Sequence, residues 1–151
     1  MNKAVVLMSL AAVLISGCGG PAPAAQQVQS GGAVTISGAW VRSASQTDRT
    51  AAAYMLIKNT GSEEVRLVSA ASNAANTLEL HETKATGGMM QMSPVKDIQI
   101  PAGGQAELKP GGLHIMLIGL TRDLKTGDQV NLSLTFEKGV TVNVTAEVKQ
   151  Q

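Results

Sequence analysis

The stretch QVNLSLTFEKGVTVNVTAEV, residues 129–148, alternates apolar and polar side chains on both sides of a short turn. Successive side chains of a strand point to opposite faces, so this alternation predicts two strands that each bury one face. Lys138-Gly139 supplies suitable turn residues between the two runs, which predicts a β-hairpin. The buried face of the first run would consist of Val130, Leu132, Leu134 and Phe136.

The chain before this hairpin contains further short β-rich runs separated by turn signals. These runs occupy residues 34–42, 52–58, 64–71, 77–82, 89–95, 105–109 and 113–120. Glycine and proline mark the turns, as in Pro101-Ala102-Gly103-Gly104 and Lys109-Pro110-Gly111-Gly112. Many short strands at this spacing predict one all-β domain over residues 34–149, an antiparallel sandwich or barrel. We expect no helix and no internal repeat.

The N-terminus has the pattern of a bacterial secretion signal. Lys3 precedes an uncharged, mostly apolar run over residues 4–15, which is short for a membrane-spanning helix. The string Ile15-Ser16-Gly17-Cys18 follows and resembles a lipobox, where cleavage before the cysteine accompanies its lipidation. Residues 1–17 are therefore expected to be a lipoprotein signal peptide, with Cys18 as the lipidated residue. The alternative is an ordinary secretory signal.

A lipid on Cys18 would anchor the protein to a membrane on the extracytoplasmic, periplasmic side of the bacterial envelope. Residues 18–33 then carry no charge and no aromatic ring, and are expected to form a flexible tether. Loss of Lys3 with the signal would leave 11 basic residues against 11 acidic ones, so attachment cannot depend on a basic patch.

Composition and motifs argue against several functional classes. Charged residues make up 15% of the chain and are balanced, so nucleic acid is not an expected partner. Aromatic residues make up only 2%, too few for a base-stacking platform. A hydrolase needs a nucleophile held by a base, and neither histidine lies in a motif of that kind. We therefore expect a protein that is not an enzyme.

The run LHIMLIGL, residues 113–120, places two unusual side chains on one face of a strand. Leu113, Ile115 and Leu117 would form its core face, so His114 and Met116 point the other way. His81 likewise lies off the apolar stripe of LELH, residues 78–81, and Met92 follows in GGMMQM. Imidazole nitrogen and thioether sulfur together form a soft ligand set that suits Cu(I).

Each of these residues alone has an ordinary explanation. An isolated histidine is usually solvated or hydrogen-bonded, and an isolated methionine usually fills a core. Met55 is expected in the core, and Met89 in packing or a loop. The prediction of a site depends on the joint occurrence of the four residues His81, Met92, His114 and Met116.

These residues match the H-x10-M-x21-H-x-M pattern of periplasmic copper chaperones of the PCuAC type, and the chain resembles that family. The surrounding segments are also similar to the family: AWVR (39–42), AAAYMLIKNTG (51–61), LELHE (78–82), MSPV (92–95), IPAGG (100–104) and LKPGGLHIMLIGL (108–120). The resemblance covers nearly all of residues 34–148. It implies a cupredoxin-like β-sandwich of the Greek-key type.

The resemblance also implies a ligand set and a role. One Cu(I) ion would be held by His81, Met92, His114 and Met116 and delivered to the CuA centre of cytochrome c oxidase. Subunit II of the oxidase, a Sco-type thiol protein, or both would be partners. Some family members carry a His/Met-rich C-terminal extension, which the ending TAEVKQQ lacks, so a second copper site is not expected.

Two further interpretations use the same residues. A blue-copper electron carrier needs a cysteine thiolate, but the chain's one cysteine is the predicted lipid anchor. Envelope copper buffering without an oxidase target stays open.

Histidine must be neutral to bind a metal, so affinity should weaken below about pH 6. Glu79 and Glu82 could orient the His81 ring, although exposed solubilising residues are the favoured interpretation.

Overall fold

The computed structural model describes residues 29–151, in which the regular elements are strands and two short 3-10 turns. The strands are β1 (Gln29–Gly31), β2 (Val34–Arg42), β3 (Thr50–Asn59), β4 (Val65–Ser72), β5 (Ala75–Thr86), β6 (Met89–Pro94), β7 (Ile98–Ile100), β8 (Gln105–Leu108), β9 (Leu113–Leu120), β10 (Gln129–Phe136) and β11 (Thr141–Lys149). The turns are η1 (Gln46–Asp48) and η2 (Glu137–Gly139). The all-β prediction is confirmed. Within residues 29–151 no helix is long and apolar enough to cross a membrane.

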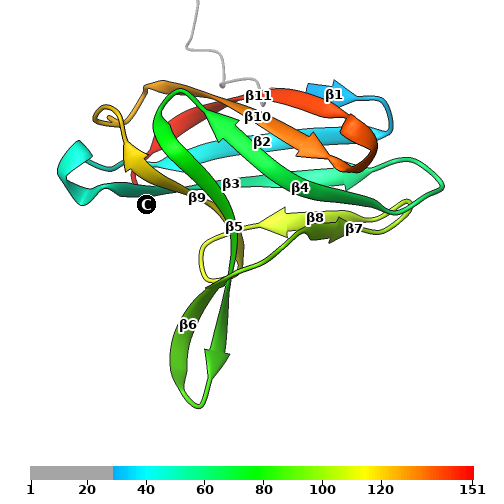
Figure 1. Cartoon of the computed structure of the whole chain (residues 1–151), viewed down its shortest axis with the longest axis horizontal. Coiled ribbons are helices and arrows are strands. Elements are labelled where there is room, and N and C mark those ends of the chain that lie inside the picture. Colours follow the sequence, from blue (N-terminus) through cyan, green and yellow to red (C-terminus); the bar gives the residue numbers. More distant parts are fainter. Residues whose placement is uncertain (1–28) are drawn as a thin grey trace, which may run out of the picture.

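The strands form one continuous hydrogen-bonded path rather than two separate sheets. Its order is β6-β5-β9-β8-β3-β2-β11-β10-β4-β7, with β1 paired to β2 and β9 also paired to β3. At one end of the path, β4 lies against β5 and β7 lies against β8 and β3, so the sheet curls into two layers (Figure 1). Most pairings are antiparallel as predicted, but β11–β2 and β8–β9 are parallel.

The C-terminal hairpin forms as its alternation predicts. In β10 and β11 every second side chain enters the core between the layers, and the intervening ones face outward. Removal of this apolar surface from water stabilises the fold, by about 1.5–3 kcal/mol for each large side chain. The buried set is Val130, Leu132, Leu134, Phe136, Val142, Val144, Ala146 and Val148.

The folded domain begins before the predicted boundary at Val34. Residues 29–31 form β1, which pairs with β2 across a turn at Gly32, so the tether prediction is wrong for this segment. A Cβ atom on Gly31 would collide with the Val142 side chain of β11. The polar, glycine-rich composition suggests a linker, but here glycine permits close packing of β1 on the sheet. The signal peptide, Cys18 and the rest of the tether lie outside the described residues.

Two other differences between the predicted and the observed strands concern β7, which was not predicted, and β5, which is longer than predicted. β7 has three residues, too few for alternation to show, although Ile98 and Ile100 are both buried. β5 continues to Thr86 instead of ending near Glu82. Its extension pairs with β6 through Gly87-Gly88, where both glycines have positive φ angles of 60° and 82°. Two such residues suit the tight turn of a β-hairpin.

Candidate metal centre

The sheet places all four predicted ligands on one face of three adjacent strands, β6, β5 and β9. His81 lies directly opposite His114, and Glu79 opposite Met116. On the other side of β5, Thr83 lies opposite Met92. Residues directly opposite one another in a ladder share a face, and residues two apart on a strand do as well. The four side chains therefore converge from strands separated by long stretches of sequence.

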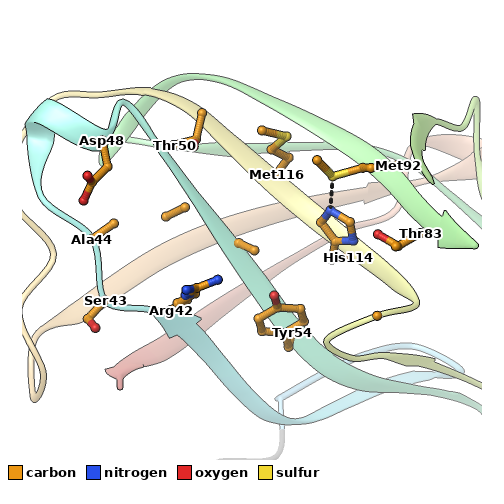
Figure 2. A pocket seen from close by; sticks show the side chains of 13 residues that line it. Arg42, Ser43, Ala44, Asp48, Thr50, Tyr54, Thr83, Met92, His114 and Met116 are labelled. Atoms are coloured by element: carbon orange, nitrogen blue, oxygen red, sulfur yellow. Dashed lines mark hydrogen bonds between the residues drawn. The ribbon is translucent and has the colours of Figure 1, made fainter. Parts of the chain in front are cut away.

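His114 is the central member of this cluster and is only 6% exposed. Its Nδ1 lies 3.0 Å from the carbonyl oxygen of Gly112. A carbonyl oxygen can only accept, so Nδ1 carries the hydrogen in the neutral ring and Nε2 has a free lone pair. That Nε2 lies 3.1 Å from the Sδ atom of Met92, which has no hydrogen to donate (Figure 2). One lone pair on nitrogen and one on sulfur thus face each other, at a separation that a metal ion bound to both atoms would span.

His81 is held through its other ring nitrogen, Nε2, whereas His114 is held through Nδ1. Its Nε2 lies 2.9 Å from the Oε2 atom of Glu79, and the carboxylate accepts the Nε2 hydrogen. Its Nδ1 is buried and has no hydrogen-bond partner. Such an orphaned buried nitrogen is costly unless a ligand completes it. The centroid of the His81 ring lies 5.8 Å from that of His114.

The contact between Glu79 and His81 changes the interpretation of this acidic residue. The sequence favoured a purely solubilising role, but the carboxylate fixes the ring through Nε2 and leaves Nδ1 as the free donor. Glu82 points to the other face of β5 and pairs with Lys84 at 2.8 Å. Glu79 therefore contacts a predicted ligand directly and would orient its ring if His81 binds a metal.

The two methionines differ in exposure. Met116 lies on β9 and is partly buried, whereas Met92 lies on β6 with 50% of its surface exposed. Met92, His114 and Met116 line one side of an open pocket of about 480 Å³, with Arg42 and Asp48 farther along it (Figure 2). His81 does not line this pocket and lies beside His114 in the sheet. Three predicted ligands thus line the pocket, and the fourth, His81, is buried as His114 is but lies outside the pocket lining.

Tyr54 of β3 lines the same pocket as His114, and sequence reasoning missed it. Its ring centroid lies 6.3 Å from that of His114 and 4.5 Å from that of Trp40. Burial raises the pKa of the Tyr54 phenol, with a smaller opposing effect of Arg42, so the phenol is neutral near pH 7. Tyr54 lies in the apolar run that marks β3, and no local signal distinguishes it from an ordinary core residue.

Residues 29–151 contain no group of three or more histidine, cysteine, aspartate or glutamate side chains that could hold a metal. The four predicted ligands on the β6-β5-β9 face offer imidazole nitrogen and thioether sulfur, and the Glu79 carboxylate on the same face is engaged by His81. This chemistry suits a soft monovalent ion better than Mg²⁺, Ca²⁺ or Zn²⁺.

The described residues form a small β-domain that gathers imidazole and thioether groups on one face. Residues 34–148 match the family described as "LpqE-like: Putative lipoprotein LpqE-like". The chain belongs to this family. It is also 39% identical over 146 residues to "Putative lipoprotein Lxx21020" from Leifsonia xyli subsp. xyli, an alignment that covers 93% of this chain and 87% of the relative.

Two solved structures resemble the whole fold. The copper-bound PCuAC domain from PmoF2 superposes with a TM-score of 0.71 at 22% identity, covering 83% of this chain and 99% of that domain. At this identity the likeness shows the fold alone. The Cu(I) form of DR1885 from Deinococcus radiodurans superposes with a TM-score of 0.63 at 40% identity, covering 76% of each chain.

Proposed function

We propose that this protein is a copper chaperone that binds one Cu(I) ion through His81, Met92, His114 and Met116. The observation that carries the proposal is the pairing of His114 Nε2 with Met92 Sδ at 3.1 Å, together with the unpartnered Nδ1 of His81, whose ring centroid lies 5.8 Å from that of His114. The similarity to the Cu(I) form of DR1885 supports it, because that protein is 40% identical to this chain. The role is metal transport and requires no catalysis.

The chemistry of these ligands favours the reduced ion. Two thioethers and two neutral imidazoles add no negative charge, so they stabilise Cu(I) more than Cu(II). They also release the ion more readily than a cage of thiolates would. His114 and Met116 belong to a central strand with a buried opposite face, which holds them rigidly. Met92, half-exposed on β6, is the ligand best placed to exchange with an acceptor.

The proposed acceptor is the CuA centre of cytochrome c oxidase, reached through subunit II directly or with a Sco-type thiol protein. Lipidation of Cys18 would keep the carrier at the membrane that holds the oxidase, on the extracytoplasmic, periplasmic side. The "lipoprotein" names of the family and of the Leifsonia relative support this anchor. Incorporation of labelled fatty acid into the wild-type protein, lost with Cys18→Ala, would test it.

Deletion of the gene would distinguish copper delivery to the oxidase from copper buffering in the envelope. Delivery predicts loss of oxidase activity at low copper, restored by added copper. Normal oxidase activity combined with copper sensitivity would instead assign envelope buffering by the same four ligands.

Titration with Cu(I) against a competing chromogenic chelator tests the binding site itself. The chain should carry Cys18→Ser in every sample, so that its thiol cannot contribute. We expect one tight equivalent in this background, lost with His114→Ala and with Met116→Ala. Met89→Leu is the matched control, because Met89 is an exposed methionine outside the proposed ligand set. Unchanged binding in the two alanine variants would refute the assignment.

A further inference from the structure

The outer strand of the β5–β6 hairpin exposes an unusual amount of apolar surface. Every residue of β6 is exposed, and the hairpin extends away from the two layers of the sheet (Figure 1). Five large apolar side chains are exposed in the described part of the chain, and three of them are Met89, Met90 and Met92. Such a cluster contributes nothing to a core, so its chemistry requires another explanation.

The register of the hairpin separates these methionines into two sets. Met90 lies opposite Ala85 and Met92 opposite Thr83, so both share the face that carries His81. Their Cα atoms are about 6.6 Å apart along the strand, within reach of two flexible thioether side chains. Met89 lies opposite Thr86 and points to the other face.

Met90 also reaches toward the pocket that contains the proposed ligands. Its methyl carbon lies 3.9 Å from the position that a Cβ atom would take on Gly111. Gly111 lines the same pocket as Met92 and His114. Met90 is 63% exposed and does not itself line the pocket, so its side chain lies in solvent next to a residue, Gly111, that does.

We propose that Met90 is an outer Cu(I) ligand that, with Met92, forms a two-thioether station on the path between solvent and the inner site. This inference rests on the proposed function. Met92 is shared by the two positions, so the ion need not leave the protein when it moves between them. The bond to Met90 sulfur forms as the bonds to the inner ligands break, and the reverse holds on loading. Copper stays Cu(I), and no proton moves because a thioether carries none.

The kinetics of Cu(I) transfer to a chromogenic chelator test this proposal. The full chain with Cys18→Ser is compared with the same chain carrying Met90→Leu or Met89→Leu. Leucine keeps the size and apolar character of methionine and removes only the sulfur. With Met90→Leu we expect the equilibrium affinity to stay within about threefold and the transfer rate to fall about tenfold, as for loss of one supporting ligand. Met89→Leu should transfer like the parent chain.

A second readout detects the outer station directly. In protein labelled with carbon-13 in the methionine methyl groups, the first equivalent of Cu(I) should shift Met92 and Met116. Met90 should shift less than these two, because the same ion visits the outer station, and Met89 should stay unchanged.

Parent-like transfer by Met90→Leu, or equal slowing by Met89→Leu, would overturn the outer station while leaving the inner site intact. No tight equivalent in the parent chain would overturn the proposed function and this inference together.

Discussion

The two hairpins β10–β11 and β5–β6 have opposite designs. In β10 and β11 every second side chain is buried, and Leu132 and Leu134 have no exposed surface. In β6 no side chain is buried, although the strand pairs with β5 over six residues. Both are antiparallel hairpins with glycine in the turn. One hairpin builds the core, and the other presents donor atoms to solvent.

This difference predicts that stability and the proposed metal binding depend on different parts of the molecule. The core between the layers does not depend on β6, so β6 can keep methionines that a core strand would bury. The proposed site joins the two regions, because His114 lies on a strand with a buried opposite face and Met92 lies on the exposed hairpin. A proposed ligand on each kind of element would give the site a rigid half and a movable half.

The largest expected effect is loss of stability from the core hairpin. Phe136 is 1% exposed, and Phe136→Ala should lower the free energy of unfolding by about 3–5 kcal/mol. Urea denaturation followed by circular dichroism measures this change. The copper affinity of the molecules that stay folded should be unchanged. A loss below about 1 kcal/mol would contradict the assignment of this hairpin to the core.

A substitution on the exposed β5–β6 hairpin should have the opposite effect, a loss of binding without a loss of stability. Met92→Leu removes the sulfur next to His114 Nε2, and should weaken Cu(I) binding about 100-fold, or about 2.7 kcal/mol. The free energy of unfolding of the copper-free protein should change by less than about 0.5 kcal/mol. Competition with a chelator and urea denaturation measure the two quantities. A large loss of stability with intact binding would show that β6 is structural.

Glu79 lies on β5 and contacts the proposed ligand His81. Glu79→Gln weakens the hydrogen bond that orients the His81 ring and should lower Cu(I) affinity about tenfold. Glu82→Gln is the matched control, because Glu82 lies on the same strand and points to the other face. Equal affinities of the two variants would return Glu79 to a solubilising role.

The smallest expected change is in stability after mild oxidation. Peroxide should convert Met89, Met90 and Met92 to sulfoxides well before Met55, which is 2% exposed. Peptide mass spectrometry gives the order of oxidation. The free energy of unfolding should shift by less than about 0.5 kcal/mol while Cu(I) binding is lost. Early oxidation of Met55 would contradict the separation between core and exposed hairpin.

Local alternation predicted the parts of the fold whose strands bury one face. The β10–β11 hairpin and the face assignment of His114 and Met116 on β9 could both be derived from a period of two. β1 and β7 could not, because three residues carry no period and Gly31 lacks a side chain. The single curled path also escaped prediction, since the pairings between distant strands that close it leave no local signal.

The ligand residues could be proposed from sequence, but their arrangement could not. The register that sets His81 opposite His114 joins strands 33 positions apart. The free nitrogen of each ring depends on its partner: Gly112 carbonyl for one and Glu79 carboxylate for the other. Residue type alone gave no preference between Nδ1 and Nε2, and made Glu79 look like a surface charge.

X-ray absorption at the copper edge of the Cu(I)-loaded protein tests the central claim most directly. The claim is that donors from the rigid strand β9 and the exposed strand β6 bind the same ion. We predict a first shell that contains both nitrogen and sulfur, with the sulfur contribution reduced by Met92→Leu and unchanged by Met89→Leu. A shell without sulfur, or identical spectra for wild type and Met92→Leu, would contradict the account.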